Sequence, residues 1–353
     1  MWAKALWMRN YKQGKVVIWS LWLVSLLLLS LPFGSQARML EGNVEQFGTS
    51  NWWFNFAYGP PLLYLGSLSI LLGILLTGWE RQTQGMDLML ALPFNRKDLF
   101  LSKWLLGVVN LAGITLINFL LMLLIHHTSV LAQHQTFAPF FVFFPYMFVF
   151  LVTVYTVTLF MGFLSGHSLS QGFLAVIALL TPLLPLILIA GGIHQHLMWL
   201  GRGNGQNLVT LMDSFFQWTP LYGLMSDFYF SWDRMNTTVN LFENNLVGVV
   251  QYVVLGVFFL ISFVGALLLS KKNPSENNGK MVMYKKLEPY VLWLGTFFSA
   301  LSVSLLMGNT LWFNTAQGSL AMFWVSFFLS GILCYVILSK LMQKPLKFRK
   351  GGI

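Results

Sequence analysis

Eight long apolar runs dominate the chain. They occupy residues 16–33, 58–78, 104–127, 139–164, 172–193, 246–270, 290–308 and 319–339. A helix needs about 20 mostly apolar residues to cross a hydrocarbon core about 30 Å thick, and each run is close to that length. None of the eight runs contains Asp, Glu, Lys or Arg. The sequence therefore predicts an all-α polytopic membrane protein with about eight transmembrane helices.

Composition excludes a water-soluble enzyme. Of the 353 residues, 56% are hydrophobic and 9% are charged, whereas about a quarter of an ordinary soluble domain is charged. With 14 Trp and 32 Phe, a soluble surface would carry large apolar patches. Cys334 is the one cysteine, so an internal disulfide is impossible.

The basic residues predict the orientation of the chain. Eighteen of the 21 Lys and Arg residues fall in 1–15, 80–103, 271–289 and the region after 339, and the other three are Arg38, Arg202 and Arg234. Basic loops stay in the cytoplasm, so both termini are expected there, in a multi-pass protein of the plasma membrane. The net charge of +10 thus fits a membrane surface, and no nucleic-acid partner is expected.

Two interpretations of residues 1–15 stay open. Bases alternate with Trp2, Leu6, Trp7 and Tyr11, which suits a short helix in the inner membrane interface. The segment can equally be a charged start to the first span. A signal peptide is disfavoured, because the apolar run is longer than a usual signal core, although residues 35–37 resemble a cleavage site.

The cytoplasmic loop 80–103 is the most informative stretch. It reads ERQTQGMDLMLALPFNRKDLFLSK. Pro93 breaks the short apolar segment before it, and Asn95 can cap a new helix with Asp98 in its first turn. If that helix continues to His127, it is about 50 Å long and must protrude from the membrane. Apolar residues between 88 and 94 stand among the charged Asp87, Arg96 and Lys97. Such a pattern suits binding of a protein partner. The alternative is that the loop lies on the inner membrane surface.

The residues of this loop resemble a known family. Glu80 closes the second span, Gly85 follows, and a stretch with Leu92, Pro93 and Arg96 leads to Lys103 and the third span. In this pattern the chain is similar to the permease subunits of type-2 ABC exporters, and most of all to the Ytr-type permeases of Gram-positive bacteria. The resemblance implies a six-helix permease core at 16–270, with 1–15 as its elbow helix.

The resemblance also implies that the loop couples the permease to a separate ATPase subunit. The coupling residues that it implies are Glu80, Gly85, Asp87, Leu92, Pro93, Arg96, Lys97 and Lys103. ATP and Mg would sit on the ATPase, and this chain would hold no cofactor. The permease would pair with a copy of itself or with a paralogous permease.

Three segments depart from a six-helix permease. A basic cytoplasmic linker at 271–289 leads to an extra two-helix hairpin at 290–340, which is followed by a basic tail at 341–353. The role of the hairpin is open. The short loop 165–171, SGHSLSQ, stands where the family has its second cytoplasmic contact, but it is uncharged.

The outer loop 194–245 is too long for a simple turn. Residues 208–216 follow helical spacing, and the WTP sequence at 218–220 ends that run. In the resembled family, re-entrant helices close the outer mouth at this position. The residues that this resemblance assigns to an outer gate are Phe215, Phe216, Trp218 and Pro220, within the segment 208–225. An amphipathic helix resting on lipid is the alternative.

Several predicted spans contain polar residues or prolines among their apolar residues. The candidates for a transport pathway or a permease interface are Asn110, Asn118, Thr153, Tyr155, Thr156 and Thr158. Interhelical hydrogen bonding alone also accounts for them, and is favoured. Prolines 139, 145, 182 and 185 can bend spans four and five.

Absent motifs narrow the function. The chain has no Walker A sequence and no HExxH or GxSxG motif, so no nucleotide or hydrolase site is visible. The outer histidines at 126, 127, 134, 194 and 196 lack ligand spacing, so neither a metal site nor a catalytic site is expected. The resemblance implies an ABC transporter permease that exports a hydrophobic compound, peptide or antibiotic. A membrane enzyme acting on a lipid-linked substrate and a secondary transporter are the alternatives, and the lack of charges at membrane depth disfavours the transporter.

Overall fold

The computed structural model of the protein describes residues 4–47, 54–57, 59–82, 95–134, 137–181, 183–201, 218–221, 229–232, 237–240, 245–271, 279–308 and 316–343. Most of them are helical. The helices are α1 (Lys4–Ser25), η1 (Leu26–Ser30), α2 (Leu31–Phe47), α3 (Gly59–Gly73), η3 (Ile74–Trp79), α4 (Glu80–Gln82), α6 (Arg96–Thr128), α7 (Leu131–His134), α8 (Ala138–Leu164), α9 (Ser168–Leu180), α10 (Leu183–Trp199), α13 (Asn245–Lys271), α14 (Glu288–Gly308) and α15 (Ala316–Gln343). The predicted all-α class is confirmed.

The helices are long enough to cross a membrane. Within the described ranges seven are long and apolar enough to span it, and α9 with α10 makes an eighth if the bent pair is one span. Their outward faces carry large apolar side chains, such as Trp19, Leu306 and Ile332, which are 65%, 72% and 67% exposed. Such surfaces are stable against lipid and not against water. The chain is therefore a multi-pass membrane protein, as predicted.

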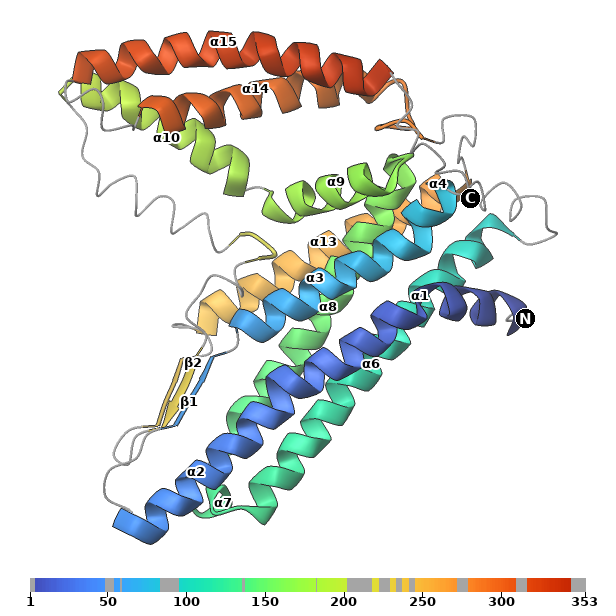
Figure 1. Ribbon diagram of the computed structural model, residues 1–353, viewed down its shortest axis with the longest axis vertical. Coiled ribbons are helices and arrows are strands. Elements are labelled where there is room, and N and C mark those ends of the chain that lie inside the picture. Colours follow the sequence, from blue (N-terminus) through green and yellow to red (C-terminus); the bar gives the residue numbers. More distant parts are fainter. Residues whose placement is uncertain are drawn as a thin grey trace, which may run out of the picture.

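The first span is longer than the sequence predicted. Helix runs from Lys4 to Gln46, over 43 residues, through the π-helix η1, whereas the apolar run covers 16–33. Residues 4–15 are helical and continuous with the span, and in Figure 1 the first turns of α1 lie at an angle to the rest. The buried residues Leu6, Asn10, Gly14 and Ile18 fall four apart, so one face of this segment packs against the bundle.

The fifth predicted span is broken. Helices α9 and α10 meet at 66°, at the point where the sequence has Pro182. Proline lacks the backbone donor that a continuing helix needs, and it disfavours helical geometry in the residue before it. By contrast, α8 continues through Pro145.

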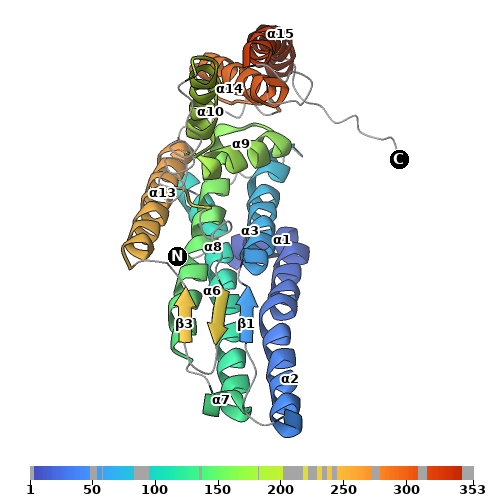
Figure 2. The same cartoon turned by 90° about the vertical axis from the view of Figure 1, so that its left-hand side faces the viewer.

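Helix α8 forms the centre of the bundle. It packs against α3, α6, α9 and α13, and Figure 2 shows it between α3 and α13. Its aromatic residues Phe140, Tyr146, Phe150 and Tyr155 are all at most 1% exposed. A helix that is apolar all round belongs in such a core.

A small sheet joins two outer segments. Strands β1 (Phe54–Ala57), β2 (Tyr229–Trp232) and β3 (Thr237–Asn240) pair antiparallel in the order β1-β2-β3. Phe54 is opposite Trp232, and Tyr229 is opposite Asn240. The sheet ties the long outer loop 194–245 to the chain before α3.

Helices α14 and α15 form the predicted C-terminal hairpin. In Figures 1 and 2 they lie with α10 across the end of the bundle at which α4 is found. Ring contacts such as Trp293 with Tyr335, at a centroid distance of 5.7 Å, hold the two helices together.

Candidate functional site: the cytoplasmic end of the bundle

The two ends of the loop 80–103 lie together at one end of the bundle. Helix α4 begins at Glu80, and α6 begins at Arg96 and runs for 33 residues, which confirms the long third span. The predicted coupling residues Gly85, Asp87, Leu92 and Pro93 lie outside the described residues. The described part of the site is therefore built from both ends of the loop and from the helices that hold them.

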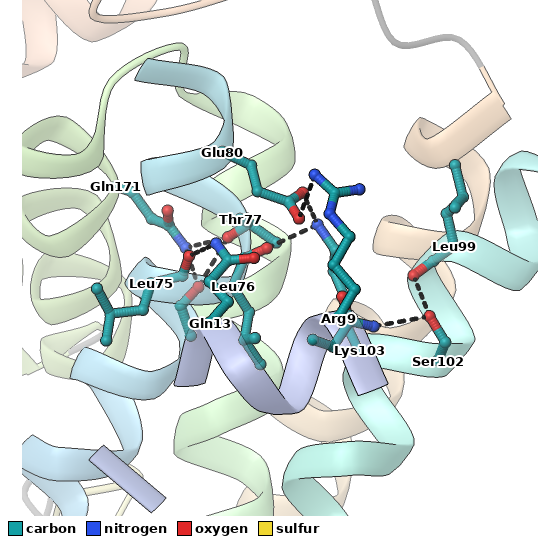
Figure 3. Close-up of polar contacts among 12 residues, drawn as sticks. Arg9, Gln13, Leu75, Leu76, Thr77, Glu80, Leu99, Ser102, Lys103 and Gln171 are labelled. Atoms are coloured by element: carbon teal, nitrogen blue, oxygen red, sulfur yellow. Dashed lines mark hydrogen bonds and ion pairs between the residues drawn. The ribbon is translucent and has the colours of Figure 1, made fainter. Parts of the chain in front are cut away.

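A buried ion pair fastens these ends to each other. The Lys103 ammonium of α6 donates to the Glu80 carboxylate of α4, and also to the Leu76 carbonyl at 2.6 Å. Glu80 and Lys103 are 3% and 4% exposed. Arg9 of α1 adds a second cation, 3.6 Å from the same carboxylate, as Figure 3 shows. Buried charges need such partners, so the pair fixes the geometry of both loop ends.

The π-helix η3 supplies carbonyl acceptors just before Glu80. A π-helical turn shifts the backbone pairing by one residue, which exposes carbonyl groups at its end. The Gln13 amide of α1 donates to the Leu75 carbonyl at 2.5 Å, beside the Leu76 carbonyl that Lys103 uses (Figure 3). A third link joins the Asn10 amide to the Ser102 hydroxyl at 3.1 Å. Helices α1, η3 and α6 are thus joined by polar bonds at this end.

Arg81 joins the loop to the turn between α8 and α9. Its guanidinium donates to the Ser165 carbonyl at 2.7 Å and contacts the Met283 sulfur. It lies 5.4 Å from the centre of the Phe163 ring, a cation–π distance. Burial lowers the pKa of Arg81 to about 10, against the opposing effects of Tyr284 and Glu80, so the side chain remains a cation at neutral pH.

Gln171 of α9 connects the same region to α8. Its amide donates to the Thr77 hydroxyl at 2.7 Å, the Thr158 carbonyl at 2.9 Å and the Gly73 carbonyl at 3.2 Å. Close packing depends on Gly78, where an added Cβ would come 2.9 Å from the Ser168 Cα. Polar bonds thereby connect this end of the bundle to α1, α3, η3, α8 and α9.

The turn between α8 and α9 is covered by part of the linker. We call residues 279–287 the linker strap. The Gly166 amide donates to the Lys280 carbonyl at 3.0 Å, the Gly279 amide to the Gly166 carbonyl at 2.9 Å, and the Met283 amide to the Leu164 carbonyl at 2.9 Å. Ser165 and His167 are each 1% exposed. The loop 165–171 is therefore a buried anchor for the strap.

His167 caps α9. Its Nδ1 accepts a hydrogen bond from the Leu169 amide at 3.2 Å, which satisfies one of the unpaired donors at the start of the helix. Burial lowers the pKa of His167. The neutral ring is thus the form that caps this helix.

Arg96 and Lys97 face outward at the start of α6. Both are exposed, and Arg96 donates to the Lys271 carbonyl at 3.3 Å. Asn95 occupies the predicted N-cap position, but its side chain makes no capping bond; its carbonyl instead accepts from the Asp98 and Leu99 amides. The predicted position of the cap is confirmed, and the predicted side-chain bond is wrong.

The polar residues of spans three and four are hydrogen-bonded within the bundle. The Asn118 amide donates to Ser25 at 2.9 Å, and its carbonyl accepts from Ser30 at 2.7 Å. Tyr155 donates to the Lys103 carbonyl at 2.7 Å. These contacts fit the packing role that the sequence favoured.

The other pathway candidates are similarly bonded. Trp22 donates to Asn110 at 3.4 Å, and Trp104 donates to Thr156 at 3.1 Å. Thr153 donates to the Val149 carbonyl at 2.8 Å, and Thr158 donates to the Val154 carbonyl at 2.8 Å. Their assignment to a pathway or a permease interface stays a prediction.

The outer gate is described in part. Phe215 and Phe216 lie outside the described residues, as does most of the predicted gate segment 208–225. Trp218 is 51% exposed, and Pro220 is buried. Within the described ranges, no group of three His, Cys, Asp or Glu side chains could hold a metal ion.

Sequence reasoning missed several residues of this site. Arg9, Asn10, Gln13 and Gln171 were not predicted, although a polar residue beside a long apolar run is a signal for an interhelical bond. Glu80 and Lys103 were predicted as coupling residues, but without their mutual contact.

Comparison with known proteins supports the resemblance. The chain is 23% identical over 311 residues to the probable ABC transporter permease YtrC of Bacillus subtilis (strain 168), and the match covers 84% of this chain and 86% of that protein. No family model and no solved structure matches it. The chain is a multi-pass cell-membrane protein that resembles the permeases of ABC transporters, and among them the Ytr type.

Proposed function

We propose that the chain is the membrane-spanning permease subunit of an ABC exporter, powered by ATP hydrolysis on separate ATPase subunits. Its cargo class is a hydrophobic compound, peptide or antibiotic. Two such permeases, identical or paralogous, would form the pathway, with ATP and Mg bound by the ATPases. The observation that carries the proposal is the buried Glu80–Lys103 pair, which fastens both ends of the loop 80–103 into the helix bundle.

A loop that is fixed at both ends can transmit force. Glu80 follows η3 directly, and Lys103 lies in the second turn of α6. Because breaking a buried ion pair costs about 3–5 kcal/mol, a push on the loop displaces η3 and α6 together instead of opening the gap between them. Arg9 and Gln13 carry the same displacement to α1.

The remaining contacts extend the movement to the centre of the bundle. Gln171 ties η3 to α8 and α9. Arg81 ties α4 to the same two helices through Ser165. In this proposal Glu80 and Lys103 are positioning residues, and the exposed Arg96 and Lys97 meet the ATPase.

Co-purification tests the proposal. The full-length chain is tagged and co-expressed with an ABC ATPase encoded beside it, and recovery of the ATPase is measured for the wild type and for Arg96→Glu/Lys97→Glu. The matched control is Lys285→Glu/Lys286→Glu, which reverses two exposed charges of the linker strap. The proposal predicts loss of the ATPase in the first variant and retention in the control. Undiminished recovery in the first variant, with both proteins folded, contradicts it.

A further inference from the structure

We propose that the linker strap and the first turns of α14 form a binding site for an anionic phospholipid of the cytoplasmic leaflet. A hollow of about 670 Å³ opens there, lined by Lys286, Pro289, Tyr290, Trp293 and Leu294. Lys286 is the cation of this lining, and the other four residues are apolar or aromatic. That combination fits an anionic headgroup joined to an acyl chain.

The strap holds its lysines in fixed places. The backbone bonds to Leu164 and Gly166 fasten residues 279–283 to the bundle, and Val282 and Met283 are 6% and 1% exposed. The Leu287 amide then donates to the Tyr284 carbonyl at 2.9 Å, which forms a turn. This turn presents Lys285 and Lys286 to the surface, where both are exposed. A lipid phosphate therefore meets cations carried on a backbone that is already fixed.

The wall has the chemistry of a membrane interface. Tyr290 and Trp293 are each 66% exposed, and such amphipathic rings concentrate at the level of lipid headgroups. Leu294 continues the wall along α14, an apolar helix of membrane length. Glu288 is the acidic residue nearest to Lys286 in the sequence. It lines a different hollow, with Tyr335 and Ser339. The phosphate would thus lie beside the lysines, and the acyl chain beside Trp293 and Leu294.

The location favours lipid over a soluble partner. Figure 1 places the start of α14 at the same end of the molecule as α4, which the basic loops assign to the cytoplasmic side. The inner leaflet carries anionic lipids, and each nearby lysine contributes about 1 kcal/mol to their attraction. A soluble acidic protein would use the lysines but would leave the aromatic wall uncovered.

Lipid titration tests this site. The full-length chain, purified in mild detergent, is titrated with phosphatidylglycerol or phosphatidylcholine, and bound lipid is counted by native mass spectrometry. The Lys285→Gln/Lys286→Gln variant is expected to bind phosphatidylglycerol about 30-fold more weakly, roughly five-fold per lysine, with phosphatidylcholine unchanged. The matched control, Lys12→Gln/Lys15→Gln, removes two exposed lysines of α1 and is expected to stay within about two-fold of the wild type.

Two further measurements test whether the ligand is a whole lipid and not a free phosphate. Trp293→Ala is expected to weaken phosphatidylglycerol binding and Trp293→Phe to restore it, because the acyl chain needs an aromatic wall. Inorganic phosphate is expected not to displace the lipid. Equal loss in the α1 control, unchanged binding in the strap variant, or displacement by phosphate would each overturn the proposal. The Lys285→Glu/Lys286→Glu variant could instead fail to co-purify with the ATPase while still binding lipid. That result would show that this surface binds a protein, and it would overturn the lipid proposal.

Discussion

Removing Lys103 should destabilise the cytoplasmic end of the bundle more than any single surface change. In Lys103→Met the Glu80 carboxylate stays buried, at 3% exposure, and loses the cation that donates to it directly. Arg9 is 3.6 Å away, and its side chain is 40% exposed, so it compensates poorly. Breaking a buried pair from one side costs about 3–5 kcal/mol. We expect the free energy of unfolding to fall by that amount.

The double variant separates pairing from packing. Glu80→Gln/Lys103→Met removes both charges of the pair together, and replacing a whole buried pair is often neutral. Unfolding is followed by denaturant titration of the detergent-solubilised chain for the wild type, both single variants and the double variant. We expect the double variant to recover most of the loss caused by Lys103→Met. Additive losses would refute the reasoning, because they would show that the two charges do not interact.

Three other residues give independent predictions. Gly78→Ala should lower the melting temperature, since its Cβ would press on the Ser168 backbone at 2.9 Å, and overpacking costs about 1–3 kcal/mol; an unchanged melting temperature would contradict this close approach. The folded-state pKa of His167 lies below its usual value because of burial, so its contribution to stability is present above about pH 6.5 and falls as the pH drops below it. His167→Asn, which keeps an acceptor for the Leu169 amide, should flatten this pH dependence of the melting temperature, and an unaltered profile would count against the cap. Asn118→Leu removes two interhelical hydrogen bonds worth about 1 kcal/mol each. The free energy of unfolding should fall accordingly in denaturant titrations. A variant more stable than the wild type would refute this prediction.

The sequence predicted the layout of the helices well, because membrane length and apolarity act locally along the chain. The 33-residue α6 and the break beside Pro182 both follow from such local rules. The extension of the first span to Gln46 was missed, because α2 carries Arg38, Glu41 and Glu45 and apolarity alone ends the span earlier. Helix can continue beyond the hydrocarbon core, where polar side chains face water.

The contacts of the site were harder to predict, because they join residues that are distant in sequence. Glu80 and Lys103 are 23 positions apart, and Arg81 reaches Met283 across 202 positions. The small sheet was missed for a similar reason, since β1 pairs with a strand far along the chain. Four-residue strands also give too short a pattern to recognise.

In the proposed function, the end of the bundle bearing α4 and the start of α6 binds a nucleotide-hydrolysing subunit. Site-directed cross-linking in membranes tests it most directly. Cys334 is the one native cysteine, so Cys334→Ser gives a background in which Arg96→Cys, or Met39→Cys on α2 as the control, carries a single photo-cross-linker. We expect an adduct with the co-expressed ATPase from position 96 and none from position 39. Cross-linking of position 96 to lipid alone would contradict it.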